Sequence, residues 1–157
     1  MNAGAFRRVL DLADPAATAE VGGRLARCLG PGDVVGLAGD LGAGKTALAR
    51  AMIGALVGQS VEVPSPTFNL VLPYRTATAT IWHFDLYRIE SRSELWELGI
   101  EEAFADGISL VEWPDRLADL MPVEALMVTL APGAGGEESR RLTLSGGGQW
   151  AARLARL

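Results

Sequence analysis

A glycine-rich turn between an apolar run and a helical pattern constrains the fold of this chain more than any other feature. Val34 to Ala38 form a short, continuously apolar run, which is typical of a buried parallel strand. The turn from Gly39 to Thr46 follows, and apolar residues then recur at helical spacing over roughly residues 45–57. Strand, turn and helix in this order begin a βαβ unit. We therefore predict an α/β fold with a largely parallel central sheet flanked by helices.

The turn reads GDLGAGKT and fits G-x-x-x-x-G-K-[ST], the P-loop. Its glycines let successive backbone N–H groups converge on phosphate oxygens, and the helix that follows directs its N-terminus at the anion. Lys45 supplies a cation for the outer phosphates, and Thr46 offers a hydroxyl to Mg²⁺. The predicted nucleotide-binding residues of the turn are Gly39, Asp40, Leu41, Gly42, Ala43, Gly44, Lys45 and Thr46.

Two acidic residues follow predicted strands and are candidates to hold the metal. Asp85 ends the run from Thr80 to Phe84, and Glu112 ends the run from Ile108 to Val111. Parallel α/β sheets bind ligands at the carboxyl ends of their strands, so both carboxylates belong near the turn. The residues alone leave open which acid binds Mg²⁺ and which orients water.

Other polar and aromatic residues have simpler explanations. Ser65 to Thr67 occupy a proline-containing loop beyond the predicted helix, where a switch loop or a plain turn are almost equally expected. His83, the single histidine, lies in an apolar run and is expected to be packed and hydrogen-bonded. We expect Trp82, Trp96 and Trp113 in the core, although Trp113 could shield the site.

The remaining chain shows no repeat and no long linker, so we expect residues 1–157 to form one P-loop ATPase domain. Asp14 and Pro15 predict a helix start, and Gly99 interrupts a helical pattern over residues 94–104. Strands are expected over residues 68–74, 78–84 and 108–111. An antiparallel hairpin is expected from the alternation at 126–130 and 142–144, with a helix around Trp150 after it.

Composition limits the function. The formal net charge is −5, which disfavours direct, tight RNA docking. Lys45 is the only lysine, so an Asn-Lys-x-Asp guanine-reading loop is excluded and ATP is favoured over GTP. Cys28 is the single cysteine and suits a reducing compartment. Charged residues interrupt the N-terminal apolar stretch, and no run approaches the ~18 residues of a membrane span, so we expect a cytoplasmic protein.

Four segments together resemble the TsaE family, small bacterial ATPases of tRNA threonylcarbamoyladenosine (t6A) synthesis. They are GDLGAGKT at 39–46, SPTF at 65–68, HFDLYR at 83–88 and VEWP at 111–114, and the similarity spans roughly residues 14–114. The last two segments are far more specific than the first. Phe68 departs from the family pattern, in which many members have tyrosine, so no role of that hydroxyl carries over to this chain.

The resemblance implies slow, Mg²⁺-dependent ATP hydrolysis together with TsaB and TsaD subunits, which would contact the tRNA in this chain's place. By motif, it implies that Thr46 and Glu112 ligate Mg²⁺, that Lys45 holds the phosphates and that Asp85 activates water. It also implies that Thr67 belongs to a switch-like loop and that Thr18 lies near the adenine.

Two other functions remain open from the sequence. A small-molecule P-loop kinase would have a similar size, and Arg88 and Arg92 could belong to a lid, but no acceptor signature stands out. A non-catalytic ATP-binding module is the third possibility. The presence of Lys45, Thr46, Asp85 and Glu112 argues against it.

Overall fold

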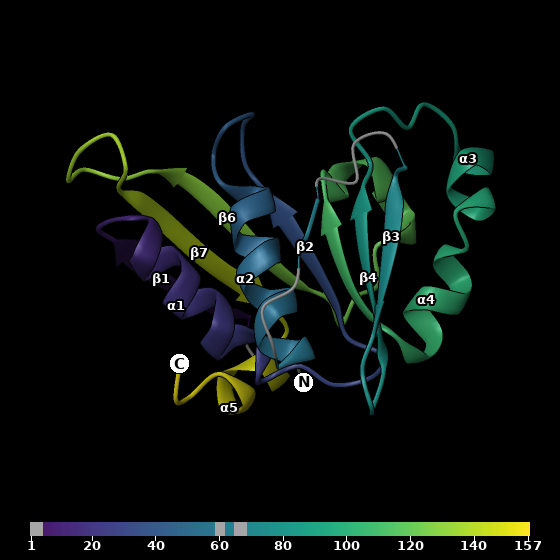
Figure 1. Ribbon diagram of the computed structural model, residues 1–157, viewed down its shortest axis with the longest axis horizontal. Coiled ribbons are helices and arrows are strands. Elements are labelled where there is room, and N and C mark those ends of the chain that lie inside the picture. Colours follow the sequence, from purple (N-terminus) through teal and green to yellow (C-terminus); the bar gives the residue numbers. More distant parts are fainter. Residues whose placement is uncertain (1–4, 59–61, 65–68) are drawn as a thin grey trace.

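The computed structural model describes residues 5–58, 62–64 and 69–157, and within these residues seven strands form one mixed sheet (Figure 1). The strands are β1 (Phe6–Leu12), β2 (Val34–Ala38), β3 (Val71–Arg75), β4 (Thr80–Asp85), β5 (Ile108–Glu112), β6 (Leu126–Pro132) and β7 (Arg140–Gly146). Their order across the sheet is β1-β7-β6-β2-β5-β4-β3.

The centre of the sheet is parallel and its margins are antiparallel. β2 pairs in parallel with β5 and with β6, and β4 pairs in parallel with β5. β3 joins β4, β7 joins β6, and β1 joins β7 as antiparallel partners. The predicted parallel centre with added antiparallel strands is therefore confirmed. The carboxyl ends of β2, β4 and β5 lie at one edge.

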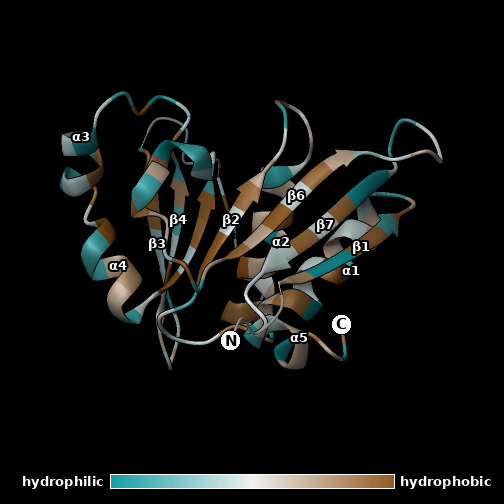
Figure 2. Cartoon of the chain, turned by 180° about the vertical axis from the view of Figure 1, so that it is seen from behind, coloured by the Kyte–Doolittle hydropathy of each residue, from teal (hydrophilic) through white to brown (hydrophobic). Residues whose placement is uncertain are grey.

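Helices cover both faces of the sheet (Figures 1 and 2). They are α1 (Pro15–Ala26), α2 (Lys45–Val57), α3 (Arg92–Glu97), α4 (Ile100–Asp106), the 3₁₀ segment η1 (Pro114–Leu120) and α5 (Gln149–Arg153). Val35 of β2 packs in the cluster that contains α1 and α2, whereas Val34 packs with residues of α3, α4 and η1. Because neighbouring residues of a strand point to opposite faces, these are two separate cores.

Local signals in the sequence explain where several helices begin and end. The side chain of Asp14 accepts a hydrogen bond from the Ala17 N–H at 2.8 Å, and Pro15 occupies the first turn of α1. Gly99 has φ 79° and separates α3 from α4. The expected break in the 94–104 pattern is confirmed, because a left-handed residue cannot continue an α-helix.

β1 was not predicted, because its apolar residues do not alternate regularly. Arg8 occupies a half-buried position where an apolar side chain is expected, and its guanidinium donates to the Leu154 carbonyl at 3.2 Å and the Leu157 carbonyl at 3.1 Å. The Arg8 side chain interrupts the apolar alternation of β1, and its hydrogen bonds to the C-terminal residues explain why an arginine is accommodated at this position.

The tryptophans divide between core and surface. Trp150 of α5 is buried, as the terminal helical pattern predicts. The core prediction for Trp96 is wrong: its side chain is 43% exposed, because it lies on the outer side of the short helix α3. Among the described residues no helix combines the length and apolar character needed to cross a bilayer.

Candidate functional site

The glycine-rich loop (Gly39–Thr46) and both predicted acids meet at one edge of the sheet. The loop leaves β2 immediately after Ala38, and Glu112 ends β5, the neighbouring strand. Asp85 ends β4 and lies opposite Glu112 in the parallel ladder. Strand order therefore brings together residues that are far apart in the sequence.

Two positions of the loop have backbone geometry that residues with a side chain do not readily adopt. Gly44, which precedes the first turn of α2, has φ 106°. Gly39 has φ 146°, and a Cβ atom there would lie 2.6 Å from the Leu130 carbonyl oxygen of β6. Positive φ at the first and steric contact at the second both require glycine. The sequence motif is thus explained by backbone geometry.

Lys45 is buried at the base of this loop. Its Nζ atom donates to the carbonyl oxygens of Gly39 at 2.7 Å and Asp40 at 2.8 Å, and it lies 4.2 Å from the centroid of the Trp113 ring. Burial lowers the pKa of the Lys45 ammonium below its ordinary value of 10.5, and the nearby carboxylates of Glu112 and Asp85 oppose this shift. The ammonium is held in a fixed position inside the loop.

Glu112 is a buried carboxylate that is hydrogen-bonded to two side chains of the site. It is 3% exposed, and the Thr46 hydroxyl donates to its Oε1 at 2.9 Å and its Oε2 at 3.1 Å. His83 Nε2 lies 2.7 Å from Glu112 Oε2 and donates to it, because a carboxylate oxygen only accepts. The prediction that His83 is packed and hydrogen-bonded is confirmed; the sequence did not indicate that its partner is Glu112.

Asp85 is buried beside Glu112 and is fixed by the backbone. Its Oδ1 accepts from the Tyr87 N–H at 3.0 Å, and its own N–H donates to the Leu70 carbonyl at 2.9 Å. The Leu86 N–H in turn donates to the Glu112 carbonyl at 3.2 Å. The two strand ends that carry the acids are therefore joined by backbone hydrogen bonds.

These residues line one cavity of about 280 Å³. Its lining residues come from the loop, the start of α2 and the ends of β4 and β5: Leu41, Gly42, Gly44, Lys45, Thr46, Ala47, Asp85, Glu112 and Trp113. Trp113 is half-buried at the rim, where its ring packs 4.9 Å from that of Tyr87. Trp113 packs against the core formed with α3, α4 and η1, and it also lines this cavity beside Lys45, as the alternative expectation of a shielding role allowed.

Thr18 lies beside the same loop but in a different cavity. It is buried in α1, and with Ala43, Gly44 and Arg140 it lines a space of about 280 Å³. The cavity thus adjoins the loop on the side of α1. The structure brings Thr18 near the loop, and its predicted role toward adenine stays a prediction. Thr67, with Ser65 and Phe68, lies outside the described residues.

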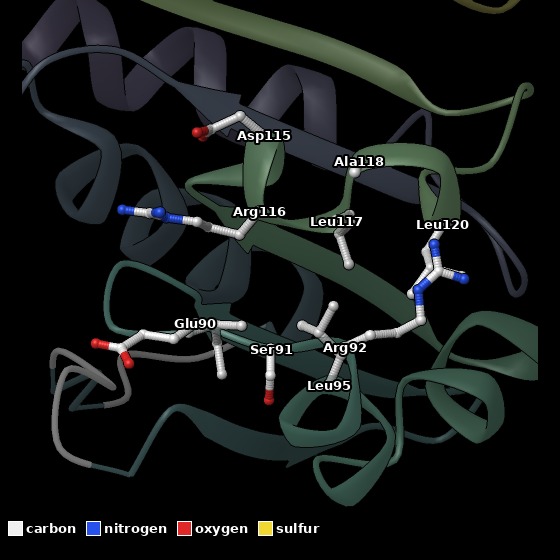
Figure 3. Close-up of a pocket in the computed structure, with 10 residues that line it drawn as sticks. Glu90, Ser91, Arg92, Leu95, Asp115, Arg116, Leu117, Ala118 and Leu120 are labelled. Atoms are coloured by element: carbon white, nitrogen blue, oxygen red, sulfur yellow. The ribbon is translucent and has the colours of Figure 1, made fainter.

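A further cavity of about 340 Å³ lies between the segment that leads into α3 and η1 (Figure 3). Figure 3 shows Glu90 and Arg116 to one side of Leu117 and Arg92 to the other. None of Lys45, Thr46, Asp85 or Glu112 lines it. It is therefore separate from the candidate site.

The comparisons with known proteins agree on one family. The sequence model of the family described as threonylcarbamoyl adenosine biosynthesis protein TsaE matches residues 12–142. The chain belongs to the TsaE family. TsaE proteins take part in tRNA threonylcarbamoyladenosine biosynthesis. The resemblance seen in the sequence is thereby confirmed.

Comparison with individual proteins supports the same family. A TsaE protein of Rickettsia felis is 44% identical over 106 residues, which make up 68% of this chain and 62% of that protein. A TsaE protein of Bacillus subtilis is 37% identical over 116 residues, covering 73% of this chain and 70% of the relative. The crystal structure of Bacillus subtilis YdiB superposes with a TM-score of 0.79 at 27% identity, covering 97% of this chain and 93% of that one.

Two contacts of the site region could not be predicted from the sequence. His83 meets Glu112 although 29 positions separate them. Arg140, the first residue of β7, donates to the Ala43 carbonyl of the glycine-rich loop, 97 positions away. Such contacts follow only from the order of strands in the sheet.

Proposed function

We propose that this chain binds ATP with Mg²⁺ in a P-loop NTPase-like fold. It hydrolyses ATP slowly, and so supports t6A modification of tRNA together with partner proteins of the TsaB and TsaD type. The observation that carries the proposal is the convergence of Lys45, Thr46, Asp85 and Glu112 on one cavity beside a glycine-rich loop. Family membership supports the link to t6A synthesis.

The donor set fits a hard divalent cation. Thr46 and Glu112 offer a hydroxyl and a carboxylate that already lie within 2.9 Å of each other. Mg²⁺ prefers oxygen ligands and typically keeps few protein ligands beside phosphate and water. Thr46 and Glu112 are two protein ligands, so oxygen atoms of phosphate and water would complete the coordination of Mg²⁺.

Different groups of the site would bind the phosphates and activate the attacking water. The loop N–H groups and the N-terminus of α2 bind phosphate oxygens, and the Lys45 ammonium neutralises the outer phosphates. When bound, Mg²⁺ supplies further charge neutralisation at those phosphates. Asp85, held by the Tyr87 N–H, orients the attacking water and accepts its proton.

Hydrolysis by the chain alone is expected to be slow. P-loop hydrolases often depend on a charge supplied by a partner, with effects on the order of 10³–10⁵ in rate. This is consistent with the TsaB- and TsaD-type subunits that the family resemblance implies. In this arrangement the partners contact the tRNA.

Phosphate release and ATP affinity, measured for three variants with and without Mg²⁺, test the assignment. Asp85→Asn should retain ATP binding and lose turnover by about 10²–10⁴-fold, the typical contribution of a general base. Glu112→Gln should lose most of the gain in ATP affinity that Mg²⁺ gives to the unaltered chain. Asp115→Asn, whose side chain is exposed on η1 and faces the other cavity, is the matched control.

The opposite pattern in the two variants would exchange the roles of Asp85 and Glu112. Transfer of phosphate to a small acceptor in place of its release would support a kinase. Absence of both activities, with the partner proteins present, would refute the proposed hydrolysis.

A further inference from the structure

Arg140 reaches the glycine-rich loop from the opposite end of the chain. Its Nε donates to the Ala43 carbonyl at 2.9 Å, and its Nη2 lies 3.5 Å from the Gly42 carbonyl. Its Nη1 donates to the carbonyls of Glu137 at 2.7 Å and Ser139 at 2.8 Å. All four acceptors are backbone carbonyls, so the guanidinium connects two loops.

The bond to the Ala43 carbonyl determines where the next N–H points. A trans peptide unit is planar, and its C=O and N–H groups point in opposite directions. Since the Ala43 oxygen is turned toward Arg140, the Gly44 N–H is turned away from Arg140. Gly44 lines the cavity that contains Lys45 and Thr46. Gly44 also lines, together with Arg140, the cavity beside α1. Arg140 therefore orients an amide donor of the loop through the carbonyl that precedes it.

The loop needs such an external restraint because of its composition. Gly42 and Gly44 have φ 81° and 106°, and glycine has access to far more backbone conformations than other residues. Peptide units flanked by glycine rotate at low energetic cost. Ordering them at the moment of binding would reduce affinity, whereas ordering them in advance preserves it.

Arg140 is itself fixed by an ordered turn between β6 and β7. The buried Ser139 hydroxyl donates to the Gly136 carbonyl at 2.8 Å and accepts from the Gly135 N–H at 3.0 Å, and the Gly133 N–H donates to the Ser139 carbonyl. The Arg140 backbone lies in β7 between β1 and β6. The guanidinium therefore extends from a rigid base.

We propose that Arg140 is a positioning residue that holds the glycine-rich loop in its anion-binding conformation through the carbonyls of Ala43 and Gly42. The inference rests on the proposed function, since the anion is the triphosphate of ATP. It adds a residue of the C-terminal hairpin to the site. In this role Arg140 acts through the carbonyls of the loop. Its side chain also lines, with Thr18 and Gly44, the cavity beside α1, so the experiment must separate positioning from direct contact with the nucleotide.

Backbone order in the nucleotide-free protein tests this role, in parallel with ATP affinity. NMR order parameters of the Gly42, Ala43 and Gly44 amides should fall from about 0.85 in the unaltered chain to below about 0.6 in Arg140→Ala. ATP–Mg²⁺ affinity should fall roughly ten- to a hundredfold, as expected when hydrogen bonds from a charged donor are lost.

Two variants serve as controls. Arg141→Ala removes the neighbouring arginine, which is exposed and pairs with Asp11 at 3.2 Å, and it should change neither quantity. Arg140→Lys keeps the charge but not the planar fork that bridges the two loops, so it should restore order and affinity only in part. It also remains informative if Arg140→Ala fails to fold.

Loss of ATP affinity with unchanged loop order would mean that Arg140 contacts the nucleotide directly, and would overturn the proposal. Unchanged order parameters together with unchanged ATP affinity in Arg140→Ala would also overturn it. Loss of loop order in a protein whose unaltered form binds no ATP would support the positioning role and refute the proposed function. The two inferences can therefore fail separately.

Discussion

At the scale of single residues, Glu112 shows how the site accommodates a buried carboxylate. Its carboxylate is almost completely buried, and a buried charge is tolerated only when hydrogen bonds replace its hydration. The Thr46 hydroxyl and His83 provide those bonds at 2.7–3.1 Å. His83 thereby orients the carboxylate proposed to ligate Mg²⁺, without facing the cavity itself.

A double-mutant cycle measures this dependence. His83→Leu removes the donor from a buried acceptor and should lower the free energy of unfolding by about 1–3 kcal/mol. In a chain that already carries Glu112→Gln the same change should cost less, with a coupling energy of about 0.5–3 kcal/mol in urea unfolding. Additive effects of the two substitutions would show that His83 stabilises the core independently of Glu112.

The residues of the site differ in how far the sequence could predict them. Lys45 and Thr46 belong to a local motif, and Asp85 and Glu112 follow apolar strands, so local patterns predicted that all four would gather at one edge. For Trp113 the sequence left open a core position or a role at the site, and the structure has its half-buried ring both against the second core and at the cavity. The pairs His83–Glu112 and Arg140–Ala43 depend on strand order, which local patterns do not specify.

At the scale of elements, the short helix α3 depends on its N-terminal cap. The Glu94 carboxylate accepts from the backbone N–H groups of Glu90 at 2.7 Å and Ser91 at 2.8 Å. These bonds lower the pKa of Glu94 below its ordinary value of 4.5. The carboxylate therefore stabilises the folded state fully above pH 4.5, and this contribution is lost as the pH falls through the lowered pKa.

Thermal unfolding as a function of pH checks this contribution. Glu94→Ala should lower the melting temperature at about pH 6, and the difference from the unaltered chain should shrink as the pH approaches about 3. Glu97→Ala, an exposed position of the same helix, is the control and should have little effect at either pH. A difference that persists undiminished in acid would mean that the charge of Glu94 does not stabilise the cap.

The elements themselves were predicted unevenly. β2 and β5 are continuous apolar runs, α2 has apolar residues at helical spacing, and α1 begins at the Asp14-Pro15 signal; the structure has each of them close to its predicted position. β1 was missed because Arg8 interrupts its apolar face to reach the C-terminal carbonyls. η1 was missed because it contains Ala118 at φ 49°, a conformation that no local preference of alanine predicts.

At the scale of the whole molecule, charge is the property that bears on partners. The chain carries a formal net charge of −5, which opposes direct binding to a nucleic acid backbone. The proposed function therefore assigns the contacts with tRNA to the partner proteins. Tyr87 and Trp96 are both more than two-fifths exposed.

Affinity capture with TsaB- and TsaD-type proteins tests this role. The chain should be retained by the two proteins together in a manner that changes with ATP, and it should not shift tRNA by itself at physiological salt. Lys45→Ala, impaired in the proposed phosphate contact, should show no response to ATP. Absence of capture in every nucleotide state would argue against the proposed complex.

Calorimetric titration of the folded chain with ATP and Mg²⁺ measures whether the glycine-rich loop and Lys45 bind the nucleotide. We expect measurable heat of binding for the unaltered chain and an affinity at least about tenfold lower for Lys45→Ala, because the ammonium would contribute hydrogen bonds to charged phosphate oxygens. Equal affinity of the two proteins, or no heat of binding for the unaltered chain, would refute the proposed nucleotide site.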